Sequence, residues 1–172
     1  MRETEADLVE LQALLDRSDG AAGPHLRSIF DDRQRATASD VVATLDGVFE
    51  MHLATVTAGG APLVAPLDGI LFHGKVWFGL PAASLRARLV RRNAAVSASF
   101  TRESFAFIVH GTAHELEPGT APATEFDALV RELYVGLYGP GWLEWHERHK
   151  RETGGDDGFN GWIEPRRMFA KC

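Results

Sequence analysis

A short basic segment is the part of this sequence best suited to bind a phosphorylated ligand. Four arginines fall within seven residues: Arg86, Arg88, Arg91 and Arg92. Ser84 stands just before them. Guanidinium groups bind phosphate oxygens in pairs, and a hydroxyl at a helix N-terminus adds donors for the same anion. The alternative is a solvated basic helix face, since Arg88 and Arg92 stand four residues apart.

Two tryptophans and two histidines share a helical pattern near the end of the chain. His146 and His149 are three residues apart, a spacing that can supply two metal ligands. The sequence contains neither the HExxH pattern nor an obvious third ligand, so we expect no metal site. Trp142 and Trp145 could cover a flat ring or a substrate. The commoner use of aromatic residues at helical spacing is a core or dimer contact.

The strand-like segments contain three further polar candidates. Asp68 is the only carboxylate within an otherwise apolar strand segment, where it could meet a ligand or cap the turn before Gly69. His52 and His110 also lie in strand-like segments, and we interpret both as structural. The sequence shows no Ser-His-Asp order and no nucleophile elbow, which gives hydrolysis no support.

Composition and charge exclude several classes of function. The 172 residues carry a net charge of −6, so we expect no binding to nucleic acid or to an anionic membrane. Cys172 is the only cysteine, which excludes an intrachain disulfide and a thiolate metal cluster. The first residues are acidic where a signal peptide would be basic, and no apolar run approaches the ~18 residues of a membrane span. We therefore expect a cytoplasmic protein.

The order of the segments predicts a small barrel. Six segments rich in β-forming residues alternate with Gly and Pro turn signals: residues 51–57, 62–72, 75–80, 94–100, 104–116 and 159–170. Helical patterns cover residues 4–16, 39–47, 83–92, 126–137 and 141–150. Most strands follow one another as hairpins, which predicts an antiparallel barrel in an α+β fold.

Individual residues refine this prediction. Pro66 and Pro165 fall within strand segments and indicate edge positions or bulges. The fifth strand is long, and we expect it to bend at Gly111. Trp77 and Phe78 are adjacent on the third strand, so one should enter the barrel while the other packs on a partner subunit.

The first 40 residues are predicted to extend a single domain. Ser39 is the expected N-cap of the second helix. A polar connector over residues 18–36 joins it to the first helix. We expect one domain over residues 1–172, with an N-terminal helical extension over about residues 1–40.

The ordered segments over residues 41–117 resemble the flavin-binding split-barrel family named for pyridoxamine phosphate oxidase. The resemblance rests on the phrase S-x-[KR]-x-[KR]-L…N, here from Ser84 to Asn93, on the small-residue strand that follows, and on IEPRRMFA as the last strand. It implies a six-stranded antiparallel split β-barrel with peripheral helices. It also implies a homodimer with FMN, or alternatively a deazaflavin, in a groove between the subunits.

The family's cofactor site implies three sets of contacts in this chain. The second strand would contact the flavin ring, and the end of the third strand would run beside the ribityl phosphate. The following helix and its serine would hold the phosphate. The implied cofactor-binding residues are, in chain order, Ala65, Pro66, Leu67, Asp68, Gly79, Leu80, Ser84, Arg86 and Arg88.

Several family residues are replaced here. Oxidases that act on pyridoxamine phosphate usually have an arginine and a lysine on the second strand, where this chain has Ala65 and Ile70. They have Arg-Lys after the serine, where this chain has Leu85-Arg86, and a glutamine in place of Ala106. The closing Arg-Leu-x-Pro is absent. We therefore interpret the chain as a divergent member and do not expect vitamin B6 oxidation.

Three functions follow from this reading. The first is a flavin-dependent oxidoreductase that moves hydride to or from a small organic substrate; because the ring carries the redox chemistry, no catalytic side chain is assigned. The second is a non-catalytic protein that binds or sequesters a flavin or haem. The third is a cofactor-free interaction domain whose groove is closed by Trp142 and Trp145. A homodimer is expected in each case, because exposed strand edges and an apolar groove need a cover.

Overall fold

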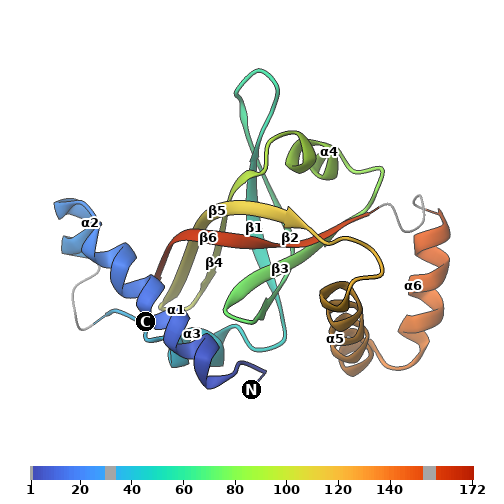
Figure 1. Cartoon of the computed structure of the whole chain (residues 1–172), viewed down its shortest axis with the longest axis horizontal. Coiled ribbons are helices and arrows are strands. Elements are labelled where there is room, and N and C mark those ends of the chain that lie inside the picture. The colour runs from blue at the N-terminus through green and yellow to red at the C-terminus, as the bar shows by residue number, and fades with distance from the viewer. Residues whose placement is uncertain (1, 30–33, 153–157) are drawn as a thin grey trace.

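Six antiparallel strands close into a barrel in the order β1-β2-β3-β6-β5-β4, and β4 pairs back with β1 (Figure 1). The strands are β1 (Val48–Val56), β2 (Pro62–Phe72), β3 (Lys75–Leu80), β4 (Ala95–Arg102), β5 (Phe105–Glu115) and β6 (Phe159–Lys171). This computed structural model describes residues 2–29, 34–152 and 158–172. The predicted α+β class and the six-stranded antiparallel barrel are confirmed.

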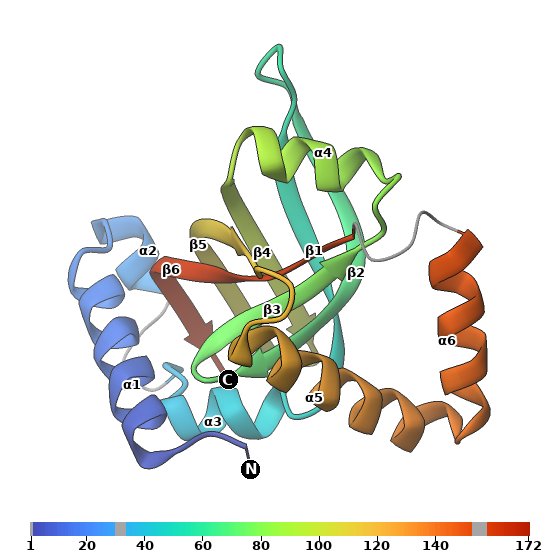
Figure 2. The same ribbon diagram turned by 45° about the vertical axis from the view of Figure 1, so that its right-hand side comes forward.

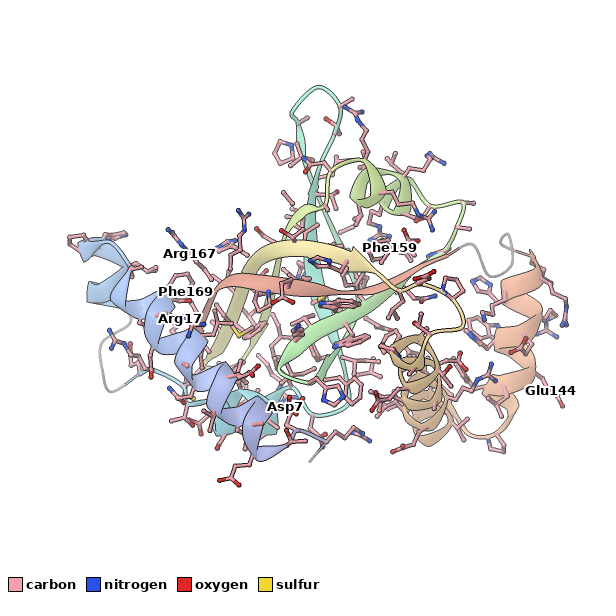
Figure 3. The ribbon with its side chains drawn as sticks, viewed as in Figure 1. Asp7, Arg17, Glu144, Phe159, Arg167 and Phe169 are labelled. Carbon is pink, nitrogen blue, oxygen red and sulfur yellow. The ribbon has the colours of Figure 1, made fainter. Side chains whose placement is uncertain are left out.

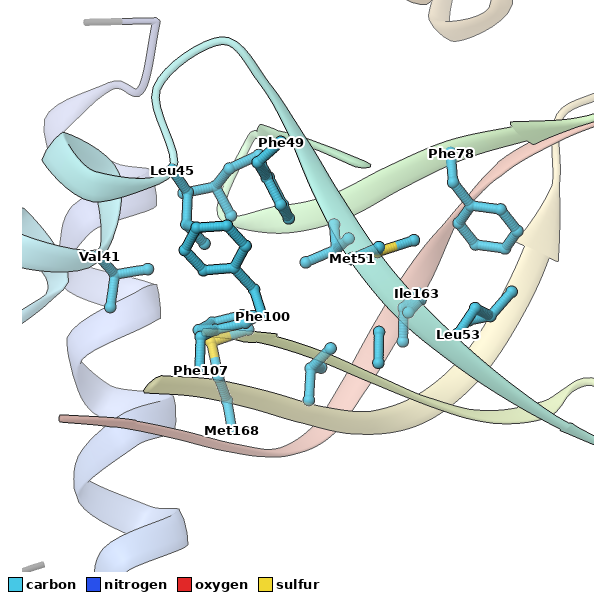
Figure 4. Packing of buried hydrophobic residues seen from close by; sticks show 14 of the residues in the cluster. Val41, Leu45, Phe49, Met51, Leu53, Phe78, Phe100, Phe107, Ile163 and Met168 are labelled. Atoms are coloured by element: carbon cyan, nitrogen blue, oxygen red, sulfur yellow. The ribbon is translucent and has the colours of Figure 1, made fainter. Parts of the chain in front are cut away.

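The barrel interior is filled by alternate residues of each strand, because successive side chains of a strand point to opposite faces. On β5, Phe105, Phe107 and Val109 are buried, while Ala106 and Ile108 between them are only half-buried. Figure 4 shows Phe107 among side chains from other strands, such as Phe100 and Met168. The central residues include Val41, Leu45, Met51, Leu53, Phe78, Phe107, Ile163 and Met168.

The N-terminal helices are α1 (Glu5–Gly20), α2 (Pro24–Ile29) and α3 (Ala38–Thr44). Two of these, α1 and α3, pack on the barrel and contribute residues to its core. Ser18 fastens α1 to β6: its hydroxyl accepts a 2.9 Å hydrogen bond from the Met168 amide. The third helix is capped by Thr37 rather than by Ser39, and Asp40 completes the capping box. The predicted connector over residues 18–36 was therefore too long, since it contains the last turn of α1 and all of α2.

The prolines within strands lie where they cost no ladder hydrogen bond. Pro66 belongs to the part of β2 that pairs with β1, whereas β3 joins β2 over Gly69–Phe72. The β5–β6 ladder shifts register at His110/Gly111, opposite Pro165. The backbones are so close there that a Cβ on Gly111 would lie 2.2 Å from the Glu164 carbonyl oxygen. The predicted edge position and the irregularity at Gly111 are confirmed.

The remaining helices are α4 (Leu85–Arg92), α5 (Ala121–Tyr138) and α6 (Gly141–Glu152). Phe78 enters the barrel, as one of the two alternating residues must. Trp77 leaves it and is only 5% exposed, because its ring packs on Phe126 of α5 with 5.0 Å between the centroids. The expectation that the outward residue packs on a partner subunit was therefore wrong: a helix of the same chain covers it. None of the described helices is long and apolar enough to cross a membrane.

Candidate functional site

A cavity of about 360 Å³ lies between the barrel and the α5–α6 hairpin. Its size falls in the range of small-molecule sites. α5 starts against the barrel and leads away to α6, which stands apart from the sheet (Figures 1 and 2). The barrel side of the lining comes from β2, β3 and the residues after β3, and the helical side comes from α5 and α6. The lining includes Asp68, Ile70, Gly79, Leu80, Ala82, Tyr134, Trp142, Trp145, His146, His149, Lys150 and Asn160.

A hydrogen bond joins the two walls of this cavity. The hydroxyl of Tyr134 on α5 donates to the carboxylate of Asp68 on β2. Burial, together with this bond, raises the pKa of Tyr134 far above its usual value, so the phenol stays protonated. Asp68 lies within β2, so it caps no turn before Gly69. Its carboxylate instead holds one side chain of the helical wall in place.

The helical wall is built from stacked rings. The ring of Trp142 lies between those of Tyr134 and His146, with centroid separations of 4.9 Å and 4.4 Å. On the same helix, Trp145 stacks on His149, four residues later, with 4.9 Å between the ring centroids. Trp142 is buried, whereas Trp145 remains 48% exposed. Because its two neighbours cover Trp142, Trp145 is the tryptophan that offers exposed apolar surface to a ligand.

An ion-pair network holds α6 against α5. Arg131 on α5 donates to Asp127 on its own helix at 2.7 Å and to Glu147 on α6 at 3.1 Å. These hydrogen bonds raise the pKa of Arg131. Glu144, on the outward side of α6, points away from the barrel (Figure 3). The pKa of His146 is lowered, first by burial and then by the neighbouring Lys150, so its imidazole is neutral at neutral pH.

The predicted phosphate-binding residues gather at the start of α4. Ser84 is the N-cap, and its hydroxyl accepts a 3.0 Å hydrogen bond from the Ala87 amide. Arg86 donates to the Pro66 carbonyl oxygen at 3.0 Å, which ties α4 to β2. Arg88 donates to the Ala83 carbonyl oxygen at 3.3 Å. Each of these arginine bonds uses one of the five guanidinium N–H donors.

The basic cluster divides into two groups. Arg91 forms an ion pair with Glu115 of β5, with 3.0 Å from Nε to each carboxylate oxygen. Arg86 and Arg88 instead bond to backbone carbonyl oxygens beside the cavity. The segment of residues 81–83, part of which lines the cavity, leads directly to Ser84. The arrangement can therefore place an anion at α4 and a ring in the cavity.

The structure brings together only some of the nine residues that the resemblance implies. Asp68, Gly79 and Leu80 line the cavity. Leu67 packs against the barrel core, and Ala65, two residues before it, points to the same face. Both side chains therefore point to the opposite face of β2 from Asp68, which lines the cavity. Pro66 faces outward like Asp68, and its carbonyl oxygen accepts a hydrogen bond from Arg86.

The position of Gly79 leaves no room for a side chain, because the space beside it is occupied by Asn160. A Cβ at this position would lie 2.8 Å from Oδ1 of Asn160, on the neighbouring strand β6. Asn160 itself lines the cavity. The missing side chain of Gly79 therefore makes room for an amide that can bind a ligand.

Sequence reasoning missed Tyr134, Lys150 and Asn160. Tyr134 follows Phe126 by eight residues and Val130 by four, so the helical period already placed it on the inward face of α5. Lys150 is related to His146 in the same way on α6. His146 and His149, which the sequence analysis considered only as possible metal ligands, both line the cavity.

Three polar residues converge elsewhere, at the β2–β3 turn. Glu3, Asp7 and His73 have candidate ligand atoms within 4.8 Å of one another. Glu3 accepts a 3.0 Å hydrogen bond from the Gly74 amide, and Asp7 completes the capping box of α1 with Thr4. We interpret this group as the attachment of the N-terminal segment to the barrel.

Comparison by sequence identifies no relatives: no protein-family model matches the chain, and no curated protein does. Solved structures do resemble it. A conserved hypothetical protein from Mycobacterium tuberculosis matches with a TM-score of 0.65 and 16% identity, covering 82% of this chain and 88% of that protein. The heme storage protein HutZ from Vibrio cholerae matches with a TM-score of 0.53 and 17% identity over 71% of this chain and 85% of its own.

An FAD-binding protein from Mesorhizobium loti also matches, with a TM-score of 0.51, 16% identity, and coverage of 77% of this chain and 89% of that one. At these identities the similarity shows the fold alone. The split-barrel fold implied by the resemblance is therefore confirmed, and proteins with this fold include both flavin-binding and haem-binding members.

Proposed function

We propose that this split-barrel protein binds FMN, with the flavin ring in the cavity between β2–β3 and the α5–α6 hairpin, and that it uses the flavin to move hydride to or from a small organic substrate. The proposal rests on one observation: a cavity and a basic helix N-terminus follow each other directly along the chain. A cavity of small-molecule size opens beside Gly79 and Leu80, and the chain leads from there to an N-capped helix with Arg86 and Arg88.

The cavity suits a flat, mostly apolar ring. Trp145, which is 48% exposed, supplies aromatic surface on one side, and the outer face of β2 and β3 supplies the other. Asp68 and Asn160 are the polar groups on the barrel side, and they can orient the ring edge by hydrogen bonds. Tyr134 keeps Asp68 in place while remaining protonated.

The start of α4 suits the phosphate. The helix N-terminus, the Ser84 hydroxyl and two guanidinium groups provide donors and positive charge within one turn. Arg86 is anchored by the Pro66 carbonyl, so its guanidinium is already oriented before a ligand arrives. Deazaflavin is the alternative cofactor, because it presents a similar ring and a phosphate in the same order.

When bound, FMN would supply the hydride-accepting and hydride-donating chemistry. The residues of this chain would bind the cofactor, exclude water from the ring with Trp142 and Trp145, and fix the cavity edge through Tyr134 and Asp68. No side chain is required to move a proton, which fits the sequence-based assignment of no catalytic residue.

We further propose that the protein is a homodimer in which a second copy covers the first half of β2. Val64 is 63% exposed and Leu63 is 38% exposed on that segment, and Leu85 at the start of α4 is 52% exposed. β1 pairs with this half of β2, and the Pro62–Leu67 edge adjoins the proposed phosphate site. Covering these side chains would remove apolar surface from water beside the cofactor.

A non-catalytic role in storing a flavin or haem is the second candidate. The exposed ring of Trp145 in the cavity lining favours it, because an aromatic surface accepts any flat ring irrespective of its redox chemistry. The Vibrio cholerae protein, which has a similar fold, is a heme storage protein.

Titration of the purified protein with FMN and with riboflavin tests the proposal. We expect FMN to bind more tightly, because riboflavin lacks the phosphate. Arg86→Met and Arg88→Met should remove this preference, whereas Arg92→Met, an exposed arginine on the same helix, should preserve it. Absence of binding by both flavins and by a deazaflavin would exclude the proposal. Binding of flavin or hemin without consumption of NAD(P)H would favour storage over catalysis.

A further inference from the structure

The β2–β3 turn holds a histidine whose two ring nitrogens both face carboxylates. Nδ1 of His73 lies 3.4 Å from Oδ2 of Asp7 on α1, and Nε2 lies 3.4 Å from Oε1 of Glu125 on α5. A neutral imidazole has only one N–H, so it can donate to only one of these oxygens. The other nitrogen then directs its lone pair at a carboxylate, unless a second proton or a metal ion lies between the two atoms.

The length of the contacts favours a metal ion over a second proton. A hydrogen bond between a charged N–H group and a carboxylate is typically about 2.7–2.9 Å long. Two ligands that each lie about 2.1 Å from a tetrahedral ion are instead about 3.4 Å from each other. The separation between Nδ1 of His73 and Oδ2 of Asp7 matches the second value. An ion on Nδ1 also leaves the Nε2 proton for Glu125, and metal-binding histidines usually have such an outer carboxylate.

Glu3 brings a third ligand to the same place. Candidate ligand atoms of Glu3, Asp7 and His73 lie within 4.8 Å of one another. The Gly74 amide donates a 3.0 Å hydrogen bond to Glu3, which holds this carboxylate beside the turn. Burial raises the pKa of Glu3, and the charge of Asp7 raises it further. A cation between the two carboxylates would offset both effects.

Within the described residues, no lysine or arginine forms an ion pair with Glu3, Asp7 or Glu125. Arg2 pairs instead with carboxylates of α5 and of the loop before β1. Lys75 pairs with a carboxylate of β6 at 2.6 Å. The carboxylates around His73 therefore form a negatively charged group that a divalent cation would neutralise.

A cavity of about 280 Å³ gives an ion access to this group. Asp7, His73 and Gly74 form part of its lining, together with Leu11 and Leu14 of α1. Three protein ligands leave one position of a tetrahedral ion open, and water can fill it from the cavity.

We propose that His73, Asp7 and Glu3 bind a divalent transition-metal ion such as Zn²⁺, through Nδ1 of the imidazole and two carboxylate oxygens. Glu125 is a positioning residue, because it contacts the histidine rather than the ion. The ion fastens the N-terminal segment and α1 to the β2–β3 turn. The cavity beside it shares no lining residue with the proposed flavin cavity, so the inference does not rest on the proposed function.

Isothermal titration of the full chain, purified without a polyhistidine tag, tests the site with ZnCl₂ and MgCl₂. We expect a single Zn²⁺ to bind per chain, and Mg²⁺ to bind more weakly, because an imidazole ligand favours Zn²⁺. His73→Asn should abolish Zn²⁺ binding. Asparagine suits the positive φ of residue 73, which is 51°, so the turn should be retained. His52→Asn, which removes an exposed histidine from β1, should preserve Zn²⁺ binding.

Thermal unfolding gives a second measurement. Zn²⁺ should raise the melting temperature of the wild type, because it binds the folded state, and EDTA should reverse the increase. His73→Asn should melt at the same temperature with and without Zn²⁺. The melting of each variant in EDTA checks that the fold is retained.

Glu125→Ala tests the positioning role. Removal of the outer carboxylate should weaken Zn²⁺ binding roughly tenfold without abolishing it, because the three ligands remain. Unchanged affinity would overturn the role given to Glu125. Three results would overturn the metal site itself: absence of Zn²⁺ binding, equal affinity for Zn²⁺ and Mg²⁺, or Zn²⁺ binding that survives His73→Asn.

Discussion

The hydroxyl of Tyr134 donates a hydrogen bond to the carboxylate of Asp68 across a separation of 66 residues in the chain. One partner lies on a barrel strand and the other on a helix that covers the barrel. The bond therefore fixes the distance between the two walls of the cavity, and it does so beside the proposed flavin ring.

Tyr134→Phe should loosen this wall without disturbing the barrel. The substitution keeps the ring that stacks on Trp142 and removes only the hydroxyl. We expect a loss of about 1 kcal/mol in the free energy of unfolding, measured by urea denaturation, because the bond reaches a charged acceptor but is partly exposed to solvent. FMN binding should weaken as well. Tyr138→Phe, on an exposed tyrosine of the same helix, is the control and should change neither quantity.

Substitutions of Ser84 should separate its capping role from its proposed phosphate contact. Ser84→Asp keeps a good N-cap but places a negative charge where the phosphate is proposed, so thermal stability should be retained while FMN binding is lost. Ser84→Asn keeps the cap without the charge and should bind FMN. If Ser84→Asp bound FMN as tightly as Ser84→Asn, the phosphate would have to lie elsewhere.

Val64→Glu should convert a homodimer into a monomer. The residue lies on the outward face of β2, is 63% exposed in the single chain, and would place a charge in the proposed interface. Gel filtration with light scattering should show a halved mass, and FMN affinity should fall because the edge beside the phosphate site is uncovered. Val9→Glu is a matched control on α1, where the side chain is 65% exposed. A wild-type protein that elutes as a monomer would contradict the proposed dimer.

Acid should destabilise the protein partly through its capping boxes. Hydrogen bonds from the Thr37 hydroxyl and amide lower the pKa of Asp40 below its usual value of 3.8. The folded state then binds this proton less readily than the unfolded state. Its contribution to stability is therefore present above pH 3.8 and is lost as the pH falls through the lower, folded-state pKa.

Asp40→Asn tests this contribution, because asparagine keeps the hydrogen-bond acceptor but does not titrate. The melting temperature of the variant should fall less steeply than that of the wild type as the pH is lowered through this range. Glu10→Gln, at an exposed carboxylate of α1, should leave the slope unchanged. Identical slopes for the wild type and Asp40→Asn would assign the acid sensitivity to other carboxylates.

The N-cap of α3 shows the limit of reading local signals. Thr37 and Ser39 both stand before the same apolar run, and both are suitable capping residues. The structure uses Thr37, because Asp40 then falls three residues later and completes the reciprocal pair of hydrogen bonds. Thr37→Ala should cost about 1 kcal/mol of folding free energy in denaturant unfolding, and Ser39→Ala should cost less. If Ser39→Ala cost more folding free energy than Thr37→Ala, Ser39 would be the N-cap, as the sequence predicted.

The sequence by itself determined the barrel, because strand alternation and turn residues act over short distances. Phe105, Phe107 and Val109 repeat every second residue, and Pro66 marks an edge whatever the rest of the chain does. The basic helix after β3 was likewise visible as a local pattern. Only the tertiary structure decided where Trp77 packs and which side chains face the cavity. Asp68, Tyr134 and Lys150 lie far apart in the chain, and no local pattern encodes how a helical hairpin packs on the outer face of a barrel.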